Sequence, residues 1–194
     1  MEGLDKAVEQ AAEILKGVEE SRETALSASR RITRLSKKVI HAIHNGEDCS
    51  ADRKAMKDEA MKLVDDLGFD MDRYPAAVDA FGEYAEAEIL KAMVDGDRMP
   101  SFVDLETVPQ SWVLGMADAI GELRRAVLVR LMDDRYDDAE RLFSCMEEMY
   151  HELSLFDVPD AVLPIRRKQD IARSVVDKTR SDIFTAKTAL KLRD

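Results

Sequence analysis

Apolar residues near the start of the chain recur every three or four positions, which is the spacing of one face of an α-helix. They are Leu4, Val8, Ala11, Leu15, Val18, Ala25, Ile32, Val39 and Ile43. This pattern predicts an amphipathic helix over most of residues 3–44. Arg22, Ser29 and Ser36 occupy positions of the same seam, so we do not expect a long uninterrupted coiled coil.

The helical period continues through the rest of the chain, and no alternating strand pattern competes with it. Asn45-Gly46 ends the first predicted helix, because both residues tolerate the left-handed conformation. Ser50 and Thr107 are predicted N-caps, since a side-chain hydroxyl accepts a hydrogen bond from a free N–H at a helix start. Further helices are predicted at about 51–67, 76–94, 108–132, 136–153 and 165–192. The expected fold is all-α, with about six long helices in a single bundle-like domain over residues 1–194.

Composition narrows the class of protein. Hydrophobic residues make up 45% and charged residues 36% of the 194 residues, with only 8 Gly and 5 Pro, which excludes collagen-like and wholly disordered chains. Cys49 and Cys145 lie far apart in the sequence, which excludes a disulfide framework and a Cys-based zinc motif. The sequence shows no signal peptide, and no apolar run reaches the ~18 residues of a membrane span. We therefore expect a cytoplasmic protein without a membrane partner.

Two pairs of carboxylates stand at helical spacing. Glu83 and Glu86 are three residues apart, and Asp118 and Glu122 are four apart, so each pair shares a helix face. In an antiparallel hairpin, Glu83 would lie level with Glu122 and Glu86 with Asp118. Four carboxylates in one small volume need compensation, and an all-oxygen ligand set favours Mg²⁺, Mn²⁺ or Ca²⁺. The alternative is ordinary solvated acids in a chain with 40 Asp and Glu residues.

Two other features have competing interpretations. Glu148 and His151 form a Glu-x-x-His motif of the kind used in di-iron bundles, which need two such motifs whereas this chain has one. Gly115 and Gly121 fall inside a predicted helix, where each costs ~1 kcal/mol relative to Ala. They indicate either close helix packing or room beside a ligand.

Basic residues gather in a stretch that lacks acids. Residues 24–46 contain no Asp or Glu although the chain has a net charge of -11, and a one-sided basic stripe is a footprint of nucleic-acid binding. The stripe consists of Arg30, Arg34, Lys37 and His41, flanked by Arg31 and Lys38. A second cluster near the C-terminus consists of Arg166, Arg167, Lys168, Arg173, Lys178 and Arg180. For either cluster, the alternative is a solvated face or cations paired with acids.

Four segments resemble the translin family, in the expected order and over most of the chain. SRRITRLSKKVIHAIH at 29–44 is similar to the SR-x-IT-x-x-SK signature of the family's first helix, and EYAEA at 83–87 to its E-x-x-E-A segment. GMADAIGELRR at 115–125 is close to the G-x-AD-x-x-GEL-x-R motif of translin-associated factor X. LPIRRKQDIARSVVDKTRSDI at 163–183 fits the last helix.

Departures from the family pattern are modest. Arg31 replaces the usual acid of the first signature, and the chain lacks the N-terminal extension of eukaryotic factor X. The shortness resembles a prokaryotic or archaeal stand-alone member, which would have to form a homo-oligomer.

The resemblance implies an all-α protein that assembles into a barrel-like, octameric particle and binds single-stranded RNA and DNA. In factor X, the carboxylates at these motif positions catalyse Mg²⁺-dependent RNA cleavage. The implied catalytic and metal-binding residues here are Glu83, Glu86, Asp118 and Glu122, and the implied nucleic-acid contacts are Arg30, Arg31, Arg34, Lys37 and Lys38.

Three functions are therefore compared. The first is a metal-dependent endoribonuclease that acts on single-stranded RNA inside a hollow homo-oligomer, with Mg²⁺ or Mn²⁺ as cofactor. The second is a non-catalytic protein that binds single-stranded RNA or DNA, as translin does. The third is a purely structural helical assembly. The complete set of four carboxylates favours the first.

Overall fold

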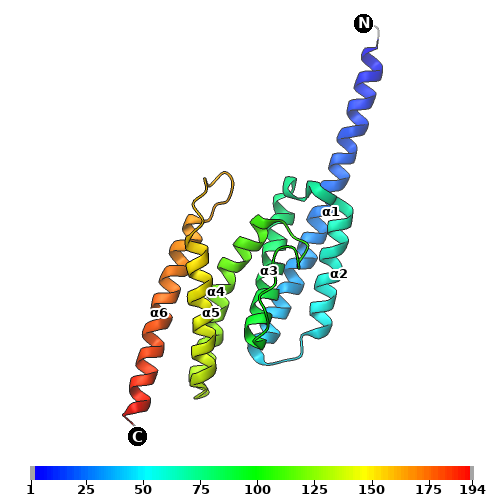
Figure 1. Ribbon diagram of the computed structural model, residues 1–194. Coiled ribbons are helices and arrows are strands. Elements are labelled where there is room, and N and C mark those ends of the chain that lie inside the picture. Colours follow the sequence, from blue (N-terminus) through cyan, green and yellow to red (C-terminus); the bar gives the residue numbers. More distant parts are fainter. Residues whose placement is uncertain (1–2, 193–194) are drawn as a thin grey trace.

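The computed structural model describes residues 3–192, apart from the side chains of residues 69 and 70. Within this part the chain forms six α-helices and a short 3₁₀ helix, and no strands (Figure 1). The helices are α1 (Leu4–Asn45), α2 (Ser50–Leu67), η1 (Gly68–Arg73), α3 (Pro75–Asp95), α4 (Pro109–Met132), α5 (Tyr136–Ser154) and α6 (Arg166–Lys191). The predicted all-α class and the number of helices are confirmed.

Glycines end two of the helices as the sequence predicts. Gly46 follows α1 with a φ of 69° and Gly96 follows α3 with a φ of 80°, a region that glycine enters without a steric penalty. The Gly46 N–H donates to the carbonyl of Ala42. These contacts satisfy carbonyl groups that the end of a helix leaves free.

The two predicted N-caps are wrong. α2 begins at Ser50 itself, and Asp48 Oδ1 accepts the hydrogen bond from the Ser50 N–H at 2.9 Å. α4 begins at Pro109, whose fixed φ suits the first helical position, so Thr107 lies too early to cap it. The Thr107 hydroxyl is buried without a hydrogen-bond partner in the described structure.

The helices α3 and α4 run parallel, not as the antiparallel hairpin that the sequence analysis assumed. Ser111 Oγ donates to the carbonyl of Val78, 33 residues earlier, and Gly115 lies against Gly82 at the same offset. Contacts that advance together along both helices require one common direction. In Figure 1, α1, α3, α4 and α6 all run downward, while α2 and α5 run upward.

The loop of residues 96–108 makes this direction possible. A helix of 21 residues such as α3 is about 31 Å long, and an extended 13-residue segment reaches up to ~43 Å. The chain therefore has enough length to return to the start of α3 before α4 begins. A short connection would have forced the antiparallel arrangement.

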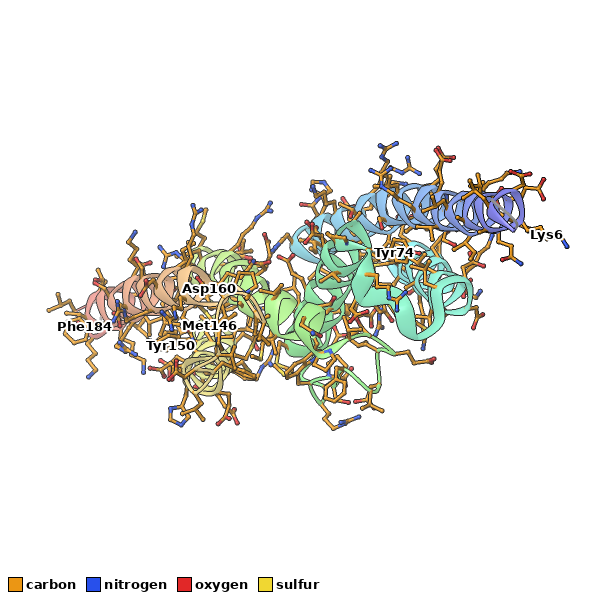
Figure 2. All side chains as sticks on the ribbon, turned by 90° about the horizontal axis from the view of Figure 1, so that it is seen from above. Lys6, Tyr74, Met146, Tyr150, Asp160 and Phe184 are labelled. Atoms are coloured by element: carbon orange, nitrogen blue, oxygen red, sulfur yellow. The ribbon has the colours of Figure 1, made fainter. Side chains whose placement is uncertain are left out.

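One hydrophobic cluster joins all six helices. Seen along the bundle, α4 lies between the α1–α3 group and the α5–α6 group, with Lys6 and Phe184 at opposite ends of the molecule (Figure 2). The first part of α1, residues 4–20, projects beyond the other helices and is exposed (Figure 1). Within the described chain, no helix combines the length and the apolar character needed to cross a membrane.

Candidate functional site

Close packing of α3 on α4 brings the predicted carboxylates together. A Cβ atom on Gly115 would lie 2.4 Å from the carbonyl oxygen of Gly82 and 2.9 Å from the backbone nitrogen of Glu86, so only glycine fits there. The close-packing interpretation of Gly115 is confirmed. For Gly121 it is wrong, because a Cβ atom there would meet nothing within 4 Å.

Glu86 lies at the centre of the four carboxylates, a set that we call the carboxylate cluster: Glu83, Glu86, Asp118 and Glu122. Burial raises the pKa of Glu86 to about 8, and the charges of Asp118, Glu83 and Glu122 act in the same direction. In the described structure, Glu86 forms no hydrogen bond or ion pair. The charge of Lys168 opposes the rise in pKa without forming an ion pair with Glu86.

The parallel helices change which carboxylates are neighbours. Burial raises the pKa of Glu83, and Asp118 contributes to the rise while Lys37 opposes it. Because the two helices run parallel, Glu83 does not lie level with Glu122, and the predicted pairing of these two is wrong. The charges of both acids of α4 act on Glu86, whereas Asp118 is the acid of α4 that raises the pKa of Glu83.

Each acid of α4 is paired with a basic side chain from another helix. Lys168 on α6 donates to both carboxylate oxygens of Asp118. His44 at the end of α1 lies with its Nε2 2.5 Å from Oε2 of Glu122. The hydrogen bond from His44 lowers the pKa of Glu122 against the effect of burial. Both acids of α4 thus have a hydrogen-bonding partner within the protein.

The donor set suits a hard divalent cation, since it consists of carboxylate oxygens alone. Among residues 3–192, however, no three His, Cys, Asp or Glu side chains are grouped closely enough to form a ready-made metal site. In this arrangement Asp118 bonds to Lys168 and Glu122 to His44. The unpaired Glu86 is the position where added positive charge would lower the electrostatic energy most.

The basic stripe of α1 divides into free and paired residues. Arg30, Arg34 and Lys37 line a groove of about 850 Å³ between α1 and α3, and within the described chain none of them forms a hydrogen bond or ion pair. Arg31 instead donates to Glu59 on α2 at 2.9 Å, and Lys38 lies 3.7 Å from Asp52. Arg31 is thus engaged in holding α2, while Lys38 contacts Asp52 and also borders the groove.

The basic cluster of the last helix is largely paired with acids. Arg173 bonds to Asp170, and Arg180 to Glu147 and Asp177. Arg166 approaches Asp157 and Asp160, at 3.9 and 4.0 Å. Arg167 and Lys168 differ, because they border a pocket of about 290 Å³ that also contains Asp118. Arg167 and Lys168 are therefore the members of the basic cluster that lie next to the carboxylate cluster.

The di-iron interpretation of the Glu-x-x-His motif is wrong. Glu148 lines a largely apolar cavity of about 520 Å³ with Trp112, Cys145 and Met149, and His151 is exposed on α5. No second motif joins them in the described chain. Cys145 is a free thiol, as is Cys49.

Sequence reasoning missed the roles of His44 and Lys168 beside the acids. Both residues belong to basic segments that the sequence analysis singled out, but their partners lie 78 and 50 residues away. Pairing over that distance depends on the order and direction of the helices. The acid-free stretch around His44 was the one available signal.

Comparisons with known proteins give concordant results. The crystal structure of AfC3PO matches with a TM-score of 0.85 and 31% identity, over 94% of this chain and 98% of that one. The structure of an AfC3PO–duplex RNA complex matches with a TM-score of 0.78 and 30% identity, over 94% and 97%. Apo-NeC3PO shares the fold with a TM-score of 0.78, over 92% and 96%, at 20% identity.

A relative found by sequence also matches most of the chain. The uncharacterized protein MJ0175 of Methanocaldococcus jannaschii is 36% identical over an alignment of 180 residues that covers 89% of this chain and 79% of that protein. No family model matches the chain.

Proposed function

Because the chain belongs to the translin family as a TRAX-like member, we propose that it is a Mg²⁺-dependent endoribonuclease that cleaves single-stranded RNA within a hollow homo-oligomer. The activity, the metal and the assembly are parts of this proposal. Mn²⁺ is expected to replace Mg²⁺, since both accept oxygen ligands.

Glu86 is the observation that carries the proposal. A carboxyl group whose pKa is raised to about 8 by burial and by three other carboxylates, and which forms no hydrogen bond or ion pair, is unfavourable in a purely structural position. Strongly perturbed groups of this kind concentrate at functional sites. A divalent cation would remove the repulsion.

The residues that would hold Mg²⁺ are Glu83, Glu86, Asp118 and Glu122. Bound there, the ion would supply activation of water and neutralisation of charge on a phosphoryl oxygen. Lys168 and Arg167, which border the pocket beside Asp118, would attract the phosphate backbone toward the cluster. The free cations Arg30, Arg34 and Lys37 would bind further phosphates along the groove of α1.

Few aromatic side chains are available for base stacking near these cations, so we expect little dependence on sequence. AfC3PO has been solved with duplex RNA, and the experiment must therefore include a duplex beside single-stranded RNA. Single-stranded DNA is a further expected ligand, because phosphate contacts do not require the 2′-hydroxyl.

A non-catalytic, nucleic-acid-binding protein is the second candidate. It is favoured by the pairs His44–Glu122 and Lys168–Asp118, which already engage both acids of α4 without a metal. In that case RNA affinity would be retained in a chelator, and no cleavage would occur with either metal ion.

The deciding experiment incubates labelled single-stranded and duplex RNA with the protein in Mg²⁺, in Mn²⁺ and in EDTA. Asp118→Asn should abolish cleavage while it retains RNA affinity in EDTA, because the amide keeps the shape but loses the negative charge. Asp137→Asn, an exposed acid on α5, serves as the control and should cleave normally. Cleavage that persists in Asp118→Asn would refute the assignment of the site.

A further inference from the structure

Glu122 is held by a buried histidine from a different helix. His44 lies in the last turn of α1, and its Nε2 is 2.5 Å from Oε2 of Glu122 on α4. The His44 side chain is 2% exposed, whereas that of Glu122 is 30% exposed. A ring enclosed to this degree cannot turn without disturbing its packing, so the hydrogen bond restricts where the carboxylate can lie.

The other ring nitrogen indicates why a histidine is present. His44 Nδ1 is buried and has no hydrogen-bond partner in the described part of the chain. Leaving such an atom unsatisfied is unfavourable, so packing alone would favour an apolar side chain at this position. The contact with Glu122 is the polar interaction that accounts for the imidazole.

Glu122 also has a basic neighbour on its own helix. Arg125 lies three residues further along α4, is exposed and forms no hydrogen bond or ion pair with the rest of the described chain. Residues three apart on a helix are neighbours on its surface, and after His44 the charge of Arg125 also stabilises the Glu122 carboxylate. Without His44, the carboxylate would be free to turn toward Arg125 and solvent.

We propose that His44 is a positioning residue that keeps the Glu122 carboxylate within the carboxylate cluster, where a divalent cation can use it. This inference rests on the proposed function, because it concerns the affinity of the cluster for a metal ion. Residues that orient metal ligands through a hydrogen bond commonly contribute about 10–100-fold to metal affinity. Lys168 differs from His44, since its flexible side chain is 31% exposed and imposes less order on Asp118.

The test measures Mn²⁺ binding to the full-length, RNA-free protein by isothermal titration calorimetry. His44→Leu should bind Mn²⁺ about 10–100-fold more weakly than the wild type. His44→Gln places an amide N–H near the position of Nε2 and should retain an affinity close to that of the wild type. His151→Gln on α5 is the matched control, because that histidine is exposed and should not affect Mn²⁺ binding.

A third variant keeps the test decisive if leucine prevents folding. His44→Asn is polar but too short to reach Glu122, so it should lose Mn²⁺ affinity as leucine does. Melting curves in EDTA identify the variants that fold. Wild-type affinity in a folded His44→Leu or His44→Asn protein would overturn the positioning role, as would an equal loss in His44→Gln. A wild-type protein that binds no Mn²⁺ would refute the proposed function itself, and the inference with it.

Discussion

Glu86 enters the folded state against the cost of burial and the repulsion of three neighbouring carboxylates. Its pKa is about 8 in the folded protein, against an ordinary value of 4.5. Between these two values the folded protein retains a proton that the unfolded chain has lost. The stability of the metal-free protein should therefore fall as the pH rises from about 4.5 to about 8, and the full penalty should persist above that range.

Glu86→Gln should remove this contribution, because the amide carries no charge at any pH. We expect the variant to melt above the wild type at pH 9 in EDTA, by roughly 2–4 °C for each kcal/mol of relief. The difference should vanish near pH 4, where the wild-type side chain is also neutral. Glu152→Gln, which replaces an exposed acid on α5, should show the wild-type profile. Identical pH profiles for Glu86→Gln and wild type would contradict this assignment of the shift.

At the scale of residues, spacing located the acids but not their partners. Local helical geometry places Glu83 and Glu86 on one face of α3, and Asp118 and Glu122 on one face of α4. This geometry follows from the spacing in the sequence alone. His44 reaches Glu122 across 78 residues of chain, and no local rule describes that approach. The division of the α1 cations into free and paired residues was equally hidden, since it depends on where α2 packs.

At the scale of helices, replacing the two glycines of α4 by alanine should have opposite effects on the stability of the protein. Gly115→Ala should destabilise the protein by about 1–3 kcal/mol, because its Cβ would overlap the backbone of α3. Gly121→Ala meets open space and should stabilise the helix by up to ~1 kcal/mol. Denaturant unfolding of both variants in EDTA measures the two effects. A loss of stability in Gly121→Ala, or none in Gly115→Ala, would refute the packing described for α4.

The cations of α1 provide a matched pair for RNA binding. Arg34→Gln removes a free charge from the groove, and Arg31→Gln removes one that is bonded to Glu59 on α2. A lost phosphate contact on single-stranded RNA lowers the slope of log affinity against log salt by about 0.7. We expect this change in Arg34→Gln alone, from affinities measured at several salt concentrations. Equal slopes in Arg34→Gln and the wild type would remove this groove from the RNA path.

Helix boundaries were predictable to within a few residues, whereas helix directions were not. Gly46 and Gly96 end their helices through an intrinsic backbone property. The predicted caps at Ser50 and Thr107 are wrong because Asp48 accepts the first N–H of α2 and Pro109 begins α4 without an N–H, each two positions away. The direction of α4 depends on the path of the loop of residues 96–108, which composition does not reveal.

At the scale of the whole molecule, the projecting part of α1 carries apolar side chains in water. Leu4, Val8, Leu15 and Val18 are each 45–67% exposed and lie on one face of the helix. An exposed apolar stripe of this kind indicates an interface. It supports the proposed homo-oligomer, for which the family resemblance suggests eight copies.

Light scattering should therefore show a species several times heavier than the 21.9 kDa chain. Val8→Glu/Leu15→Glu should reduce that mass while the helical circular dichroism signal persists, because the two residues lie outside the core of the protomer. Lys6→Glu/Lys16→Glu, which changes exposed polar positions of the same segment, serves as the control. A monomeric wild type at micromolar concentration would contradict the proposed assembly.

The pairing of Asp118 on α4 with Lys168 on α6 has a consequence for biosynthesis. The acids of α3 and α4 leave the ribosome before Lys168 on α6, which follows Glu83 by 85 residues. At roughly 5–20 residues per second, translation of that interval takes roughly 4–17 s. During this time the nascent chain already contains His44, the partner of Glu122, but α6 with Lys168 has not yet been synthesised. The charge balance of the cluster is thus completed by one of the last segments to be synthesised, so a chain that terminates early cannot acquire it.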